Sequence, residues 1–145
     1  HFVGDVHQPL HCGLAADGGG NAIHVVWTDD KQKNLHEIWD TSVITKSVED
    51  DFAGSEDGFL QSLLGDIQGE WSANITAWEN SRPEGWAEES LRYACGVAYR
   101  HSGGQWIRSN DTLTEGDYEA FLPVVRLRLA QGGVRLASVL NKIYS

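Results

Sequence analysis

Histidine and aspartate residues recur at a spacing of four near the start of the chain. One pair is His1 and Asp5, and a second is His36 and Asp40. On an α-helix, residues four apart lie on one face about one turn apart, so each pair could hold one cation. Imidazole with carboxylate suits zinc, and the set lacks the thiolates of structural zinc fingers. Because His11 in the following loop could reach the same place, the pattern predicts a metal site.

The other histidines and a neighbouring thiol do not fit this pattern. His7 is expected to end the first helix and to point away from the cluster, and His24 falls in a predicted strand, so structural roles are expected for both. His101 lies beside a glycine loop and is expected to be solvated. Cys12 adjoins His11; a small buried thiol is the favoured interpretation, and a role as a ligand stays open.

Three consecutive glycines precede Asn21 in the loop between the predicted ligands. One interpretation is a flexible connection. The other is that Gly19 and Gly20 let the backbone approach a substrate, while the amide of Asn21 hydrogen-bonds a base or a phosphate. The position between His11 and His36 favours the second interpretation. No Lys-Ser/Thr follows and no strand precedes the loop, which excludes a P-loop.

The elements that must position these residues are mostly helical. The expected helices are 1–7, one that Asn34 caps, 47–65, 66–78, 86–100 and one from the cap Thr114 to Ile143. Pro123 is expected to kink or divide the last helix, and Gly132-Gly133 to permit close packing. A strand is expected at 22–28, with a polar turn at 29–33 after it. Trp39 is expected to pack beneath the site. The prediction is a mainly α fold with a short β element.

Length and charge narrow the function classes. The chain has 145 residues, 41% of them hydrophobic, which fits one domain with a core. No apolar run reaches the length of a membrane span. With 21 acidic and 11 basic residues, the formal charge is −10, which argues against a duplex-binding basic face unless bound cations supply positive charge. The chain lacks methionine and opens within a patterned segment, so we expect its N-terminus to be a cut edge.

Three segments, in order, resemble the S1/P1 nuclease family. They are HFVGDVHQPLH at 1–11, DGGGN at 17–21 and NLHEIWD at 34–40. The stretch LRLAQGGVRLASVLN at 127–141 is similar to the closing helix of that family. The family comprises trinuclear-zinc nucleases and 3′-nucleotidases that prefer single strands. The rest of its zinc cage lies upstream of the first segment, so the resemblance implies that 1–145 is the C-terminal portion of a single nuclease domain whose N-terminal part is missing.

The resemblance assigns each candidate ligand a place. His1 would bind the first zinc ion, and Asp5 would bridge that ion to the third. His11, His36 and Asp40 would together hold the second zinc ion. The intact enzyme would therefore carry three zinc ions, and this chain is expected to complete one site. Six positive charges from three zinc ions would remove the objection that the acidic composition raises.

The resemblance also implies a substrate. Gly19, Gly20 and Asn21 would line a pocket for a nucleobase. The implied activity is hydrolysis of phosphodiester bonds in single-stranded DNA and RNA to 5′-nucleotides, and of 3′-nucleotides, by a monomer without a membrane partner. In such enzymes, clustered zinc ions activate water and stabilise charge on phosphate oxygens. The isolated chain is expected to be inactive.

Two alternatives stay open. A bacterial zinc phospholipase C shares the trinuclear site, but its last ligand is typically glutamate and it lacks the Gly-Gly-Asn loop; Asp40 and Asn21 therefore favour the nuclease. The second alternative is a zinc-binding fragment without activity.

The compartment is expected to be the secretory pathway, the exterior or the periplasm, because the family is secreted and disulfide-bonded. The segment around Cys95 resembles a helix bridged to an upstream cysteine, and Asn74 and Asn110 begin acceptor sequons for glycosylation.

Overall fold

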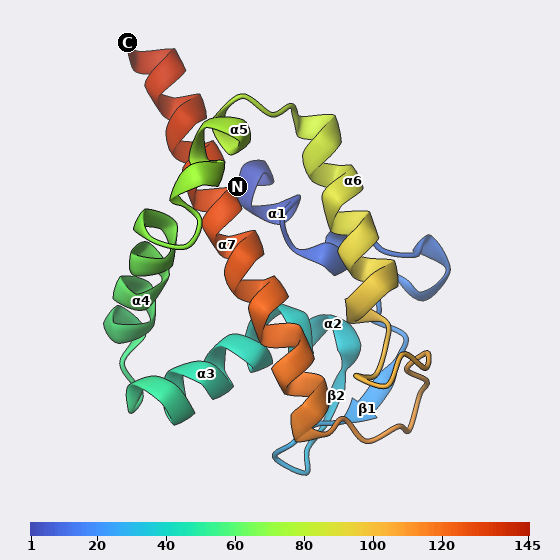
Figure 1. The fold of residues 1–145 in the computed structure, drawn as a ribbon. Helices are drawn as coiled ribbons and strands as arrows, with labels where there is room; N and C mark the ends of the chain where they lie inside the picture. The colour runs from blue at the N-terminus through green and yellow to red at the C-terminus, as the bar shows by residue number, and fades with distance from the viewer.

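Helices form most of the structure, a computed structural model that describes residues 1–145 (Figure 1). In chain order the elements are α1 (Phe2–Asp5), η1 (Pro9–Cys12), η2 (Ala15–Asp17), β1 (His24–Val26), β2 (Gln32–Asn34), α2 (Leu35–Glu37), the π-helical turn η3 (Ile38–Ser42), α3 (Val43–Phe52), α4 (Glu56–Gln68), η4 (Ser72–Asn74), α5 (Ile75–Glu79), α6 (Pro83–Tyr93), the π-helical turn η5 (Ala94–Ala98) and α7 (Glu115–Tyr144). A mainly α fold with a short β element is confirmed. None of these helices combines the length and the apolar character that crossing a membrane requires.

The long helix α7 is the axis on which the other elements pack. Thr114 and Asp117 form a capping box, in which each side chain accepts a hydrogen bond from the other residue's backbone N–H. From there α7 runs past α3, α4, α5 and α1 to the C-terminus (Figure 1). The prediction that Pro123 divides this helix is wrong, since Pro123 lies within a continuous α7. Packing along both halves of α7 offsets the hydrogen bond that proline removes.

The main hydrophobic core lies between α7 and the segment from β1 to α3. The first part contributes Val25, Leu35, Ile38, Trp39 and Val43, and α7 contributes Tyr118, Phe121, Val124 and Val125; η1, η5 and the loop before α7 supply further members. Trp39 is 2% exposed, and its ring centroid lies 5.0 Å from that of Phe121. The prediction that Trp39 packs inside the protein is confirmed, so the helix that carries Asp40 is anchored directly in the core.

Several predicted boundaries differ from the structure. The predicted helix 66–78 is wrong, because these residues are divided between the end of α4, η4 and α5. The predicted helix 47–65 is interrupted at Ala53 and Gly54, whose φ angles are 51° and 81°, and Ser55 caps α4 through a hydrogen bond from the Gly58 N–H. The first helix ends at Asp5 rather than at His7. Pro9 begins η1 instead of ending a helix, because proline suits the first helical position. The predicted turn at 29–33 includes the start of β2, which pairs antiparallel with β1.

A buried charged network joins α7 and α6 to the segment that follows α1. Glu89 on α6 accepts hydrogen bonds from Arg128 at 2.6 Å and from Arg135 at 2.7 Å. Arg128 also donates to the His7 carbonyl, and Arg135 lies 2.8 Å from His7 Nε2. Both guanidinium groups are buried, so their charges depend on these partners. The network fixes the position of the residues between Asp5 and His11.

His7 therefore has the structural role predicted for it. Its ring is 3% exposed, and Nδ1 lies 2.6 Å from the Val3 carbonyl. A Cβ added at Gly132 would lie 3.4 Å from His7 Cγ, whereas one at Gly133 would meet nothing within 4 Å. The expectation of close packing at these two glycines is thus confirmed for Gly132 and wrong for Gly133.

We expect His7 to make the metal-free protein acid-labile. Burial and the nearby charges of Arg128 and Arg135 lower the pKa of His7 to about 4, from 6.5. As the pH falls, the unfolded chain takes up this proton before the folded chain does, so stability is complete above about pH 6.5 and declines towards pH 4. Between pH 7.5 and pH 5 the folded state should lose about 2 kcal/mol from this group.

The measurement is urea unfolding at both pH values with chelator present. A His7→Gln variant should be less stable at pH 7.5 but should show a pH-dependent loss smaller by about 2 kcal/mol. His101 contributes with the opposite sign, because its aspartate partners raise its pKa, and that contribution is common to both proteins. Equal pH-dependent losses in wild type and variant would contradict the prediction.

Candidate metal centre

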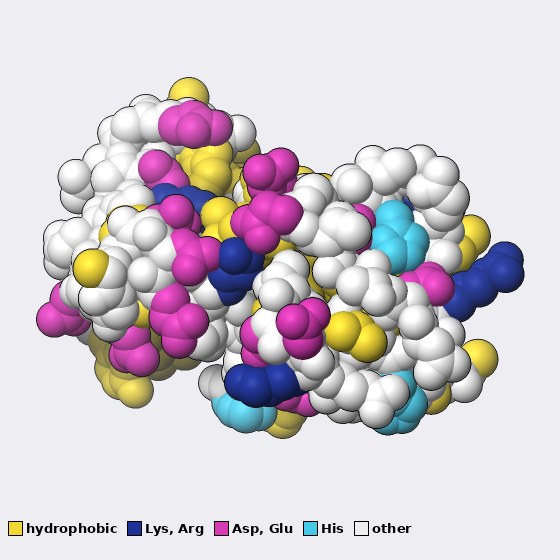
Figure 2. Space-filling view, turned by 90° about the horizontal axis from the view of Figure 1, so that it is seen from below, with side chains coloured by type: hydrophobic (Ala, Val, Ile, Leu, Met, Phe, Trp, Pro, Cys, Tyr) yellow, Lys and Arg dark blue, Asp and Glu magenta, His cyan; other side chains and the backbone are white.

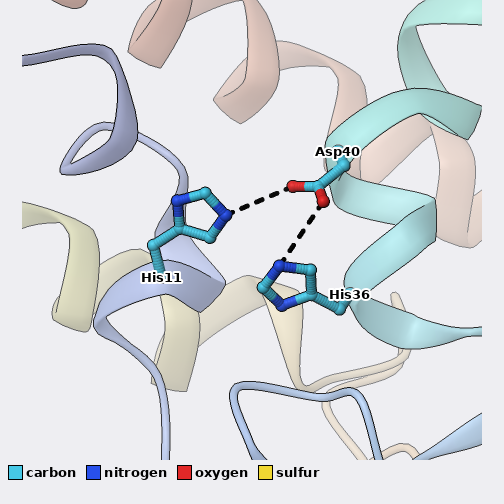
Figure 3. A group of neighbouring side chains, drawn as sticks. All are labelled: His11, His36 and Asp40. Carbon is cyan, nitrogen blue, oxygen red and sulfur yellow. Dashed lines mark ion pairs between the residues drawn. The ribbon is translucent and has the colours of Figure 1, made fainter. Parts of the chain in front are cut away.

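His11, His36 and Asp40 converge on one point, although they come from three elements, η1, α2 and η3 (Figure 3). His11 Nε2 lies 3.4 Å from Asp40 Oδ1, and His36 Nε2 lies 3.4 Å from Asp40 Oδ2. The two imidazole rings are stacked with centroids 5.0 Å apart. One ligand atom from each side chain lies within 4.8 Å of the others. The three residues thus form a possible metal-binding group.

The second nitrogen of each imidazole faces a backbone carbonyl. His36 Nδ1 lies 2.7 Å from the Gly19 oxygen, and His11 Nδ1 lies 3.0 Å from the Asp5 oxygen. A carbonyl can only accept, so Nδ1 of each ring must carry a proton and donate it. In the neutral imidazole, Nε2 then presents its lone pair to Asp40. This outer arrangement, an Nδ1–H fixed by a carbonyl, is the one that orients histidine ligands in metal sites.

The contacts with Asp40 are longer than hydrogen bonds and leave space that a cation could occupy. At 3.4 Å they exceed the 2.7–2.9 Å typical of charge-assisted hydrogen bonds. Two Nε2 lone pairs that face a carboxylate repel it, and a cation between them would remove the repulsion. With zinc bonds of about 2.0–2.1 Å, neighbouring ligand atoms in a tetrahedron lie about 3.3–3.4 Å apart. The two contacts reach different oxygens of Asp40, and one ligand atom from each side chain lies within 4.8 Å of the others, so the donor set is compatible with zinc.

Local sequence explains how the ligands are presented. Asn34 Oδ1 accepts a hydrogen bond from the Glu37 N–H at 2.7 Å and starts the helix that carries His36. This predicted cap is confirmed. The helix widens into the π-helical turn η3 before Asp40, a change that the sequence pattern did not predict. Such π-helical turns occur frequently at functional sites, and here His36 Nε2 and Asp40 still face each other.

Gln8 contacts the candidate centre and was not identified from the sequence. Its Nε2 donates to Asp40 Oδ1 at 2.8 Å, and its Oε1 accepts the Leu10 N–H at the start of η1. One side chain therefore connects the helix that carries His11 to the carboxylate of Asp40. A polar residue directly before Pro9 is a helix-start signal, which could have identified the cap. Its second contact, across 32 residues, could not be read from the sequence.

His1 and Asp5 form a second group beside the first. His1 Nε2 lies 3.3 Å from Asp5 Oδ2, and His11 Nδ1 lies 3.6 Å from Asp5 Oδ1. The Asp5 carboxylate thus lies between His1 and the centre formed by His11, His36 and Asp40. It is 43% exposed, so a cation from solvent could reach it.

The glycine loop supports the centre from one side. The Gly19 carbonyl holds His36, and a Cβ at Gly19 would lie 2.4 Å from the Leu10 oxygen, so only glycine fits at its φ of +66°. Gly20 is buried against Leu10, with its N–H on Asp17 Oδ1 at 2.7 Å. Asn21 is exposed, and its amide donates to the Gly18 carbonyl at 2.9 Å. Of the three residues proposed for a base pocket, Gly19 alone has a hydrogen bond to a candidate ligand.

Two cavities flank the centre. One, of about 350 Å³, is mainly apolar and lies between the segment after α1 and α7, with Trp39, Asp40 and Leu129 in its wall. The other, of about 780 Å³, is more open and extends from His11 and His36 along Gly19 to Leu14. Neither cavity includes Asn21 in its wall. A substrate phosphate could therefore approach the ligands from the side of the glycine loop.

The expectation that His101 is solvated is wrong. Its side chain is 21% exposed, with Nδ1 3.1 Å from Asp117 Oδ2 and Nε2 3.1 Å from Asp111 Oδ2. Although burial opposes the charged form, these two carboxylates raise the pKa of His101. His101 therefore ties the loop after η5 to the start of α7.

Cys12 and Cys95 are both free thiols and both partly buried, and Cys12 is not part of the metal-binding group.

Comparison with known proteins gives the family context. The family model described as S1/P1 Nuclease matches residues 1–145. Endonuclease 2 of Arabidopsis thaliana is 40% identical over 149 residues, which cover 99% of this chain and 49% of the relative. Nuclease P1 of Penicillium citrinum is 31% identical, over 99% of this chain and 55% of the relative. Nuclease S1 of Aspergillus oryzae is 30% identical, over 100% of this chain and 52% of the relative. The chain spans about half the length of the curated relatives it matches.

Proposed function

The chain belongs to the S1/P1 nuclease family, and from this premise we propose that it is part of a zinc-dependent phosphodiesterase acting on single-stranded DNA, RNA and 3′-nucleotides. The single observation that carries the proposal is the convergence of His11, His36 and Asp40, with both Nδ1 atoms fixed by carbonyls. The names of the relatives, endonucleases and nucleases, agree with a hydrolase of phosphodiester bonds.

We propose zinc as the resident ion of this centre. Two imidazole nitrogens and one carboxylate leave a fourth position free, which is the arrangement of catalytic zinc sites. Zinc bound there would polarise phosphate oxygens and lower the pKa of a bound water molecule. The chain's own residues orient the ligands: Gln8 holds Asp40, the Gly19 carbonyl holds His36 and the Asp5 carbonyl holds His11. Asp5 and His1 are proposed to contribute to two further zinc sites, for three in the intact enzyme.

The geometry suits a single strand better than a duplex. The ligands lie beside an open cavity bounded by the glycine loop, where an unstacked nucleotide could place its base beside the phosphate. A base in a duplex would first have to leave its stack. The exposed amide of Asn21 both donates and accepts, which suits the edge of a base. The chain is acidic and would repel phosphate, but bound zinc ions would supply the positive charge that attracts it.

Asn21→Ala should weaken substrate binding without loss of zinc. Loss of the hydrogen bond between the Asn21 amide and the base is expected to cost roughly 1–3 kcal/mol of binding free energy, which would raise KM. Zinc content should stay unchanged, because the ligands and the Gly19 carbonyl that orients His36 remain in place. The measurement is KM for thymidine 3′-monophosphate and for single-stranded DNA, together with zinc per chain, in the enzyme that contains this chain. An unchanged KM would mean that the base is bound elsewhere, while the proposed activity would stand.

The activity itself is tested by substrate class. Zinc-loaded enzyme should release nucleotides from single-stranded DNA and RNA and phosphate from 3′-nucleotides, and should leave phosphatidylcholine intact. If the enzyme hydrolyses phosphatidylcholine but none of the nucleic-acid substrates, the proposal is overturned in favour of a phospholipase. Zinc binding without hydrolysis of either class would identify a binding protein.

We also propose that the enzyme belongs to the secretory pathway or the periplasm and acts as a monomer. Asn74 and Asn110, which begin the two sequons, are both exposed, so a glycan could be attached to either. Mass spectrometry of protein from its native source, before and after deglycosylation, tests the export. A free thiol at Cys95 in that material would argue against the proposed bridge to an upstream cysteine.

A further inference from the structure

Trp106 stands apart from the other tryptophans in its exposure. Of the six, four are buried, Trp71 is partly buried, and Trp106 is 45% exposed. It lies in the loop between η5 and α7, at the lower right of Figure 1. Tryptophan is enriched at binding interfaces, and this exposed ring is available for contact with a ligand.

The loop holds this ring in one place. The Arg100 guanidinium lies over one face of the indole, 4.3 Å from the ring centroid. The backbones of Arg100 and Trp106 form an antiparallel bridge, and the His101 N–H donates to the Gln105 carbonyl at 2.9 Å. Although Arg100 lies over the ring and the Tyr99 ring is 6.1 Å away, 45% of Trp106 remains exposed. The ring is thus presented as a fixed platform.

Cationic groups accompany the platform. Arg100 donates from Nε to the Cys95 carbonyl and from Nη1 to the Gly104 carbonyl, both at 2.8 Å, which leaves Nη2 without a partner in the chain. Arg108 is exposed two residues beyond Trp106. The nearby carboxylate of Asp111 is already paired with His101. In Figure 2, acidic side chains gather on the left of the molecule and are sparser on the right, the side on which this loop lies.

The base of the same loop contacts the proposed substrate cavity. Tyr99 Oη donates to Asp17 Oδ1 at 2.9 Å and accepts the Leu14 N–H at 3.0 Å. Leu14 lines the larger cavity that begins at His11 and His36. The rings of Tyr99 and Trp106 are 6.1 Å apart. The platform therefore lies beyond the end of the cavity that is remote from the ligands.

We propose that Trp106, backed by Arg100, is a second base-stacking site for single-stranded nucleic acid, outside the metal centre. The inference rests on the proposed function. Any base could stack on the exposed part of the indole ring, and Arg100 Nη2 and Arg108 could contact phosphates, so the site would not select sequence. Because it lies beyond the cavity, a nucleotide bound only at the metal centre would not reach it. The site would thus strengthen the binding of longer strands alone.

Affinity as a function of strand length tests this inference. Fluorescein-labelled oligothymidylates, from the dinucleotide to about a dozen nucleotides, are titrated with the zinc-loaded enzyme that contains this chain, and anisotropy is measured. Trp106→Ala should bind the longest strands about tenfold more weakly and the dinucleotide with unchanged affinity. Trp106→Phe, which keeps a stacking face, should recover most of the loss. Tyr144→Ala removes another exposed aromatic and should have no effect.

The outcomes separate the inference from the proposed function. If the wild type binds all lengths and Trp106→Ala does not change any affinity, the second site is wrong and the proposed function stands. If Trp106→Ala loses affinity equally at every strand length, the second site is also wrong, because Trp106 would then act on the metal centre or on the fold. If the wild type binds no single strand of any length, the proposed function fails and the inference fails with it.

Discussion

A His36→Ala variant of this chain should lose tight zinc binding, whereas the wild-type chain should hold about one zinc ion. Within these 145 residues, one group of three side chains has ligand atoms close enough to share an ion, and His36 supplies one of its two imidazoles. Even changes to the residues that orient ligands cost about 10–100-fold in metal affinity, and loss of a ligand costs more. The variant keeps Asn34 as the helix cap and the core contacts of Trp39, so the fold should be retained.

The measurement is zinc per chain after dialysis against a chelator of known affinity. His24→Ala is the matched control, because His24 is an exposed histidine on β1 outside the group, and it should keep its zinc. Circular dichroism of both variants reports the fold. Tight binding of three zinc ions by the wild-type chain, or undiminished zinc in His36→Ala, would show that the ligands have been assigned incorrectly.

The candidate ligands could be predicted because they depend on local spacing. His36 and Asp40 are four apart on a helix that Asn34 begins, and both the cap and the facing arrangement are present. Local rules of this kind need no knowledge of the rest of the chain. The mainly helical fold could be predicted for the same reason, since Asn34, Ser55 and Thr114 cap their own helices.

The groups that orient the ligands could not be predicted, because they depend on contacts between distant residues. Gln8 reaches Asp40 across 32 residues, and Gly19 reaches His36 across 17. The glycine loop beside His101 predicts a solvated side chain, whereas its two carboxylate partners, Asp111 and Asp117, follow it by 10 and 16 residues and are brought to it by the fold. The strand β2 was missed because its residues, Gln32–Asn34, are polar and take their conformation from pairing with β1.

Asp5→Asn, made in the enzyme that contains this chain, is expected to lower hydrolysis by several orders of magnitude while the fold is retained. If Asp5 bridges two zinc ions, its two oxygens set the spacing of these ions, and asparagine removes one charge and one bridging oxygen at nearly constant size. The structure places Asp5 Oδ2 3.3 Å from His1 Nε2 and Oδ1 3.6 Å from His11 Nδ1, so the carboxylate lies between two candidate ligands.

The same substitution separates a bridging role from a merely supporting one. The bond that orients His11 is made by the backbone carbonyl of Asp5, 3.0 Å from His11 Nδ1, and asparagine keeps this carbonyl. Zinc held by His11, His36 and Asp40 should therefore remain, and the loss should fall on kcat and on the other zinc ions. Asp50→Asn, on the exposed side of α3 where Asp50 pairs with Lys46, is the matched control and should keep full activity. If Asp5→Asn cleaves single-stranded substrate at nearly the wild-type rate, Asp5 does not bridge zinc, and its proximity to His1 is an ordinary surface ion pair of the kind that contributes little.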